Sequence, residues 1–195
     1  MIEFIECFKP NQNFYKFSKE NYYEFIEGIF PGYYYNYQSV VTWKNDNKKH
    51  CFSNKLLKHI PLKNWDGIAF ILENQKELVI CNSDGSIRLK VNVPSELIQI
   101  EDFQSGFNLS ESETQNVFND DEFIMSYDRF DDYFEFEGKS YISVKVKRYH
   151  SSNSQDAFLQ MRYLDCKTGE FLPFTKTISK YVENQHGYNE ASVNI

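Results

Sequence analysis

Carboxylates and aromatic rings are interleaved in one stretch of the chain, residues 119–138, which reads NDDEFIMSYDRFDDYFEFEG. The wider segment 101–137 holds twelve Asp and Glu residues against a single base, Arg129, so its net charge is −11, while the rest of the chain carries +4. Like charges packed this closely repel one another and weaken folding at low ionic strength. The cluster therefore points to a positively charged partner, because carboxylates pair with Lys and Arg, and tyrosine rings make cation–π contacts with them.

The predicted binding surface lies within this stretch and consists of carboxylates and tyrosines. Its residues are Asp120, Asp121, Glu122, Tyr127, Asp128, Asp131, Asp132, Tyr133, Glu135 and Glu137. At its C-terminal end Phe134 and Phe136 alternate with the two glutamates, so a strand here would place the carboxylates on the face opposite the phenylalanines. We expect a basic protein as the partner, and we expect reversal of the three aspartates within residues 128–132 to weaken its binding.

The sequence shows weaker patterns for a metal site or for catalysis. Neither NDDEF nor DRFDD has the alternating oxygen ligands and the glycine of an EF-hand loop, although an irregular cation site stays open. The four histidines, at positions 50, 59, 150 and 186, stand in scattered polar contexts, and no GxSxG motif or phosphate-cradling glycine loop occurs. With twelve acids in one segment, a carboxylate pair at glycosidase spacing arises by chance. We predict no catalytic residue, no metal ligand and no cofactor, and hence a protein that is not an enzyme.

The composition indicates a soluble globular protein. At 195 residues the chain can bury a core, and 18 Phe and 14 Tyr supply large rings to fill it. The N-terminal MIEFIECFKP has glutamates and no continuous apolar run, and no window is apolar enough to span a bilayer, so we expect a cytoplasmic protein without membrane contact. A net charge of −7 opposes approach to nucleic-acid phosphates. The four widely spaced cysteines are expected to be small buried hydrophobes.

The first third of the chain is expected to mix helix and strand. A serine N-cap and a terminal glycine predict a short helix over residues 18–28. The aromatic and β-branched run 33–43 predicts a strand, and the polar run 44–50 predicts a loop. A second short helix is predicted over residues 52–61, where a proline ends it.

The remainder of the chain indicates β-hairpins. Runs 68–72, 78–81 and 87–93 are separated by Asp-Gly and other turn residues, which predicts a three-stranded meander. The first two strands should be buried on both faces and the third half-exposed. Two further hairpins are predicted, with turns at Gly138 and at residues 167–169.

These elements together predict a mainly β (α+β) fold. Antiparallel meanders and hairpins would form a sheet, a sandwich or a partly open barrel, with one or two short helices in the N-terminal third. We expect a single domain over residues 1–195. Residues 184–195 lack an apolar period and are expected to be a frayed tail.

The acidic and aromatic run 120–137, in a small chain rich in Phe, Tyr, Asn and Lys, resembles the immunity proteins of bacterial toxin systems, including those of contact-dependent inhibition. The resemblance is one of overall character. It implies a protein that binds a cognate toxin domain, often a basic nuclease, and covers its active site or locks it inactive. Two other classes stay open: a structural or adaptor module, phage-like or a partial propeller suggested by LDCKTGEF, and a carbohydrate-active enzyme with two opposed carboxylates in a deep pocket.

Overall fold

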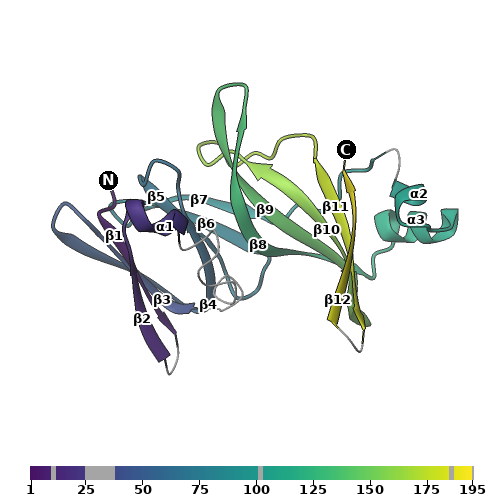
Figure 1. The fold of residues 1–195 in the computed structure, drawn as a ribbon, viewed down its shortest axis with the longest axis horizontal. Coiled ribbons are helices and arrows are strands. Elements are labelled where there is room, and N and C mark those ends of the chain that lie inside the picture. The colour runs from purple at the N-terminus through teal and green to yellow at the C-terminus, as the bar shows by residue number, and fades with distance from the viewer. Residues whose placement is uncertain (10–11, 25–37, 101–102, 185–186, 195) are drawn as a thin grey trace. The chain divides into compact units, whose positions relative to one another are not determined.

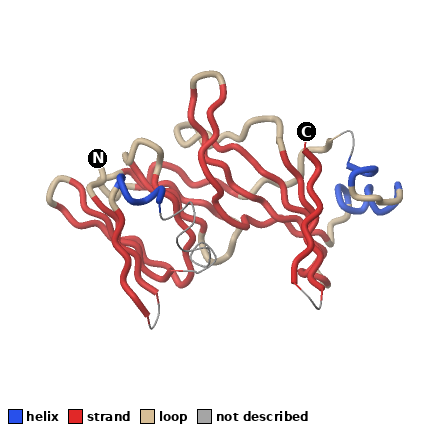
Figure 2. Tube along the Cα trace, in the orientation of Figure 1, coloured by secondary structure: helices blue, strands red, loops and turns tan. Residues whose placement is uncertain are grey.

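The computed structural model of the chain describes residues 1–195 except 10–11, 25–37, 101–102, 185–186 and 195. It is mainly β, with open antiparallel sheets and a few short helices, which confirms the predicted fold class (Figure 2). The sequence suggested one domain, whereas the structure divides into two compact units. Unit 1 comprises Met1–Asn92 and Cys166–Gly169, and unit 2 comprises Val93–Asp165 and Glu170–Ile195.

Unit 1 is built on a seven-stranded antiparallel sheet with the strand order β2-β1-β3-β4-β5-β6-β7 (Figure 1). Its elements are β1 (Phe4–Lys9), β2 (Gln12–Phe17), α1 (Lys19–Glu24), β3 (Gln38–Asn45), β4 (Lys48–Pro61), β5 (Gly67–Ile71), β6 (Glu77–Asn82) and β7 (Ile87–Asn92). The long strand β4 joins the two halves of this sheet, because residues 48–57 pair with β3 and residues 58–61 pair with β5.

Large rings fill the core of unit 1. Trp43, Trp65 and Phe70 are fully buried, and the ring of Phe52 stacks on Phe70 with 4.5 Å between centroids. The indole N–H of Trp43 donates a 2.8 Å hydrogen bond to the carbonyl oxygen of Ser83, so its single polar group is satisfied. These rings anchor β3 and the meander to one another.

The three-stranded meander is confirmed as β5, β6 and β7. Every residue of β5 is buried, as is the centre of β6. In β7, by contrast, Val91 is buried while Ile87 is 53% exposed. The sequence therefore correctly distinguished the two buried strands from the half-exposed one.

Two predictions in the first third of the chain are wrong. Residues 52–61, predicted as a helix, lie in β4, and most of the predicted loop 44–50 belongs to β3 and β4. A two-residue turn at Asp46 and Asn47, with φ angles of 48° and 64°, joins the two strands. Asp and Asn tolerate this left-handed conformation. Pairing with β3 and β5 outweighs the local helical pattern, because β preference depends on neighbouring strands that only the tertiary structure supplies.

The predicted helix over residues 18–28 is found as α1, which covers Lys19–Glu24. Tyr22 on this helix is buried, and its ring makes edge contacts with Phe17 and Trp65 at 5.8 and 5.9 Å between centroids. The strand predicted over residues 33–43 is found from Gln38 onwards in β3. The remaining parts of both predictions lie outside the described residues.

Unit 2 is built on a five-stranded antiparallel sheet with the strand order β12-β11-β10-β9-β8. Its elements are α2 (Phe103–Gly106), α3 (Glu111–Asn119), β8 (Phe123–Phe136), β9 (Lys139–His150), β10 (Asn153–Leu164), β11 (Thr177–Asn184) and β12 (Gly187–Asn194). The predicted hairpin at Gly138 is confirmed, with φ of 72° at the glycine. After the turn at residues 167–169, a single bridge between Leu164 and Phe171 stands in place of the predicted second strand.

The C-terminal stretch is a strand, where the sequence predicted a frayed tail. Residues 187–194 form β12, which pairs with β11 from Gly187 to Asn194. Backbone hydrogen bonds to a neighbouring strand need no apolar period, so hydrophobic patterning alone could not reveal this strand.

The segment that leads from β7 to β8 packs on the sheet of unit 2. The ring of Phe103 in α2 contacts that of Phe158 in β10 at 5.2 Å between centroids. The side-chain amide of Gln160 accepts from the backbone N–H of Ile98 and donates to its carbonyl oxygen, both at 2.8 Å. The ring contact and the paired hydrogen bonds fix α2 and the chain before it on the sheet.

His59 gives unit 1 a pH-dependent stability. Its ring lies 3.3 Å from Cys7 Sγ and beside Phe70, and burial lowers the pKa of His59 to about 4. The unfolded chain takes up this proton near the usual pKa of about 6.5, so stability is fully present above that pH and is lost as the pH falls towards 4. Because the side chain keeps some solvent exposure, we expect a loss of about 2 kcal/mol rather than the full 3.

Urea unfolding of the wild type and of His59→Gln at several pH values between 4 and 7 checks this expectation. The variant should lose less stability across that window, because glutamine does not titrate. Equal pH dependence in the two proteins would contradict the role of His59.

Candidate functional site

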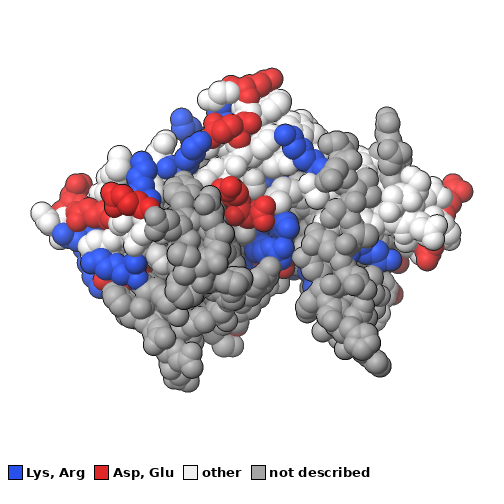
Figure 3. All heavy atoms as spheres, viewed as in Figure 1, with Lys and Arg blue, Asp and Glu red and all other residues white. Residues whose placement is uncertain are grey.

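Unit 2 carries all of the excess negative charge. Its residues include 18 Asp and Glu against 8 Lys and Arg, a net charge of −10, whereas unit 1 has 10 and 13, a net charge of +3. Figure 3 shows Asp and Glu side chains at the tip of the β8–β9 hairpin and around α3. The uneven charge distribution of the sequence is thus a difference in net charge between the two units.

The ten predicted binding residues do not form one continuous surface. Strand β8 has 14 residues, so roughly 40 Å separate its two ends. Residues 120–122 precede this strand and follow α3, while residues 128–137 occupy its second half and the turn beyond (Figure 1). We name the first group, together with Glu111 and Glu113 in the first turn of α3, the α3 acidic end. The name refers to the part of unit 2 that carries α3, and the group includes acids from both ends of this helix. The second group, the hairpin acids, contains Asp128, Asp131, Asp132, Glu135 and Glu137.

Asp128 and Asp131, among the hairpin acids, form ion pairs within unit 2. The pairing of β8 with β9 shifts register at Asp128 and again at residues 131–132, where extra residues bulge out of the strand. Asp128 forms an ion pair with Arg129 at 3.0 Å, and Asp131 lies 3.9 Å from the ammonium group of Lys145. Reversal of these aspartates would therefore disturb contacts inside the unit as well as any partner.

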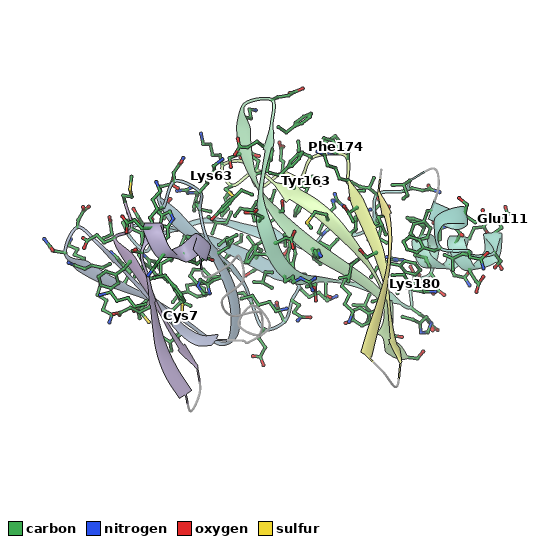
Figure 4. The ribbon with its side chains drawn as sticks, in the orientation of Figure 1. Cys7, Lys63, Glu111, Tyr163, Phe174 and Lys180 are labelled. Atoms are coloured by element: carbon green, nitrogen blue, oxygen red, sulfur yellow. The ribbon has the colours of Figure 1, made fainter. Side chains whose placement is uncertain are left out.

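The predicted alternation at the end of β8 is confirmed. The ring of Phe134 stacks on Tyr163 with 4.1 Å between centroids, and Phe136 contacts Phe174 at 5.1 Å (Figure 4). Glu135, between the two phenylalanines in the strand, is exposed. The carboxylate of Glu135 and the rings thus point to opposite faces of the hairpin, whereas Glu137 lies beyond the strand, in the turn, with φ of 49°.

Tyr127 is not part of a binding surface. Its side chain is fully buried, and this burial raises the pKa of its phenol well above the usual range. Its partner in the register is Val146, which is equally buried. In the first half of β8 three consecutive residues, Met125, Ser126 and Tyr127, are buried, which the alternation of acids and rings in the sequence did not reveal. Tyr133, in the second half, is half-buried.

A capping box determines where α3 begins. Ser110 and Glu113 form a capping box, in which the serine Oγ accepts from the Glu113 backbone N–H and the glutamate Oε2 accepts from the Ser110 N–H at 2.8 Å. The Ser110 hydroxyl also donates to Oε2 of Glu113 at 2.6 Å, and this hydrogen bond, with that from the Ser110 backbone N–H, holds the pKa of Glu113 below its usual value. At the other end, Asp120 accepts at Oδ1 from the backbone N–H of Glu122 at 2.8 Å. The carboxylates of Glu113 and Asp120 are therefore held by the backbone.

Arg148 attaches the C-terminal end of α3 to the sheet. It lies in β9, is 5% exposed, and donates hydrogen bonds to the carbonyl oxygens of Val117, Phe118 and Asp120. The last carbonyls of a helix have no partner within the helix, so an arginine is well suited to this end. Burial lowers the pKa of the guanidinium, while the charge of Asp120 raises it.

A pocket of about 410 Å³ lies between α3 and the sheet. Its lining combines apolar walls with charged and polar groups: Leu109, Glu113, Asn116, Val117, Asp120, Phe123, His150, Ser152, Phe158 and Lys180. Four of these residues come from α3 and its C-cap at spacings of three, four and seven, which place them on one helix face. Lys180 lies over the ring of Phe158 at 5.6 Å and is close enough to Glu113 to lower its pKa.

At the edge of this pocket the tertiary structure brings together three residues that the sequence did not connect. His150 Nε2 lies 2.9 Å from Oε2 of Glu122, and its Nδ1 lies 2.6 Å from Oγ of Ser152. Glu122 was predicted as part of the binding surface for a basic partner, and His150 as a histidine in a scattered polar context. The one available signal was the closeness of His150 and Ser152 in the chain, since Glu122 is 28 positions away from the histidine.

In the part of the chain that the structure describes, no three His, Cys, Asp or Glu side chains gather closely enough to hold a metal ion, and none of the helices is long and apolar enough to cross a membrane. The four cysteines, all of them among the described residues, form no disulfide: Cys7 and Cys81 are buried as expected, whereas Cys51 is exposed and Cys166 half-buried. No protein-family model, no curated protein and no solved structure matches the chain.

Proposed function

We propose that this protein binds and neutralises a basic protein, and that the α3 acidic end is the centre of the contact. A cognate toxin domain with a positively charged cleft, such as a nuclease, is the first partner class to test. The observation that carries the proposal is the net charge of −10 on unit 2. A field of this size raises the rate of encounter with a basic partner and competes with the phosphates that a nuclease binds.

The α3 acidic end is favoured over the hairpin acids because of the pocket beside it. Both groups contain exposed carboxylates without an ion-pair partner among the described residues: Glu111 and Asp121 in the first, and Asp132 and Glu137 in the second. The pocket that adjoins the α3 acidic end adds apolar walls, and interfaces gain much of their affinity from side chains that fill such pockets. The hairpin acids instead lie across from a strand, β9, that carries bases such as Lys139 and Lys145.

Two double charge reversals of equal size test this assignment. Glu111→Lys with Asp121→Lys changes the α3 acidic end, and Asp132→Lys with Glu137→Lys changes the hairpin. Both change the net charge by the same amount, so their long-range effects on a basic partner are matched. We expect the first pair to weaken binding about 50-fold and the second less than about fivefold, since contact pairs couple more strongly than distant charges.

The measurement begins with affinity capture from the lysate of the source organism at low salt, followed by elution at high salt and identification of the retained protein. The dissociation constants of wild type and both variants for that purified partner are then compared at several salt concentrations. The dissociation constant should depend less steeply on salt concentration in the α3 variant than in the wild type, and should keep its wild-type salt dependence in the hairpin variant. Co-expression should also protect cells if the partner is toxic. Equal loss in both variants would show that only overall charge matters, and the proposed contact would be abandoned.

A further inference from the structure

Glu122, His150 and Ser152 form a continuous chain of hydrogen bonds at the edge of the pocket. Oγ of Ser152 lies 2.6 Å from Nδ1 of His150, and Nε2 of the same ring lies 2.9 Å from Oε2 of Glu122. A hydroxyl, an imidazole and a carboxylate in this order are the parts of an activated serine nucleophile. The packing of α3 is supported separately, by the hydrogen bonds of Arg148.

Two turns of unit 2 hold these residues in place. Glu122 lies in the turn before β8, and Ser152 lies in the turn between β9 and β10. The backbone N–H of Ser151 donates a 2.8 Å hydrogen bond to the carbonyl oxygen of Glu122, which ties one turn to the other. Phe123 pairs with His150 across β8 and β9, and the edge contact of their rings, at 5.2 Å between centroids, restricts the imidazole. The geometry therefore follows from strand register.

The hydrogen bonds also select one tautomer of His150. The backbone N–H of Ser152 lies 3.2 Å from Nδ1, and this group can only donate. Nδ1 is therefore the acceptor, available to the serine hydroxyl as well, and the ring proton resides on Nε2, from which it is donated to Glu122. This is the arrangement in which an imidazole can remove a proton from a serine while a carboxylate supports the charge that develops.

The pocket beside these three hydrogen-bonded residues suits a small ester. Both His150 and Ser152 line it, and Phe123, Val117 and Phe158 form apolar walls in a volume of about 410 Å³. Lys180 also lines the pocket, and its ammonium group, 5.6 Å from the ring centre of Phe158, supplies a positive charge for a developing oxyanion. Apolar walls with a few convergent polar groups are typical of sites for small molecules.

We propose that Ser152, His150 and Glu122 hydrolyse small carboxylic esters that bind in this pocket through a short apolar acyl group. Ser152 Oγ attacks the carbonyl carbon while its proton passes to Nδ1 of His150. The C–O bond to the alcohol breaks, and the departing oxygen takes that proton from Nδ1. Water then attacks the acyl-serine, gives one proton to Nδ1, and releases the carboxylic acid as the proton returns to Ser152. Glu122 acts as a positioning residue through the imidazole.

Hydrolysis of p-nitrophenyl acetate and p-nitrophenyl butyrate by the full-length protein tests the proposal. Ser152→Ala and His150→Gln should each lower kcat/KM about 100-fold, the range for loss of a nucleophile or general base. Ser151→Ala, in the same turn, is the matched control: it removes a hydroxyl but keeps the backbone N–H that bonds Glu122, so it should stay within twofold of wild type. Glu122→Gln should lower kcat about tenfold with KM unchanged, which a purely structural role would not produce.

Covalent labelling provides a second readout that does not depend on turnover. A fluorophosphonate probe should attach to Ser152, and mass spectrometry of the digested protein should locate the adduct there in wild type and in Ser151→Ala but not in His150→Gln. Thermal unfolding of each variant confirms that it is folded. Ester hydrolysis equal in wild type and Ser152→Ala, absence of hydrolysis, or absence of an adduct on Ser152 would each overturn the proposal. The outcome is independent of whether the protein binds a basic partner.

Discussion

Replacement of Arg148 by alanine is expected to destabilise unit 2 by about 3 kcal/mol and to release α3 from the sheet. The guanidinium is 5% exposed and donates to the carbonyl oxygens of Val117, Phe118 and Asp120. Without it, these terminal carbonyls of the helix lose their partner in a buried setting. Because α3 forms one wall of the pocket, the variant should also lose binding of a basic partner and hydrolysis of esters.

Urea unfolding followed by far-UV circular dichroism measures the change in stability. Both tryptophans, Trp43 and Trp65, belong to unit 1, so tryptophan fluorescence follows that unit separately. Faster hydrogen exchange over residues 111–119 would report the release of α3. Arg88→Ala is the matched control, since Arg88 bonds to Asn82 and Asp66 nearer the surface and should cost only about 1 kcal/mol. Unchanged exchange in α3 would contradict the anchoring role of Arg148.

Gly67→Ala is expected to destabilise unit 1 by about 3 kcal/mol, at the upper end of the cost of overpacking a core. A Cβ atom at this position would collide with the backbone carbonyl oxygen of Cys81 and would lie 2.9 Å from Cδ1 of Leu62. Leu62 can move, but the carbonyl belongs to β6, which pairs with Gly67 through Asn82. The close approach of two backbones therefore requires glycine here.

The midpoint of urea unfolding measures this effect, by tryptophan fluorescence for Gly67→Ala in unit 1 and by far-UV circular dichroism for the control variant in unit 2. Gly138→Ala is the control: its Cβ would meet nothing within 4 Å, so the only cost is the left-handed backbone, with φ of 72°. That cost is about 1 kcal/mol. If the two alanine variants lost the same stability, backbone conformation rather than the contact with Cys81 would be the cause.

The sequence by itself determined the β class, the central meander and the position of several turns. These features are local: alternation and apolar runs define strands such as β5 and β6, and residues that accept positive φ, such as Gly138, define the turns. It also determined the concentration of acids between residues 101 and 137, and the opposite facing of Phe134 and Glu135. Each of these follows from neighbours in the chain.

Only the tertiary structure decided the rest. Residues 52–61 became a strand because β3 and β5 pair with them on either side, and residues 187–194 because β11 does. The length of β8 divided the acids into two groups, which a list of charges cannot show. The contact of Glu122 with His150 arose from the register of β8 with β9, a pairing between positions far apart in sequence. Local sequence patterns do not show which distant strands pair. This pairing determined the positions of the α3 acidic end and of the hydrogen-bonded serine, histidine and glutamate.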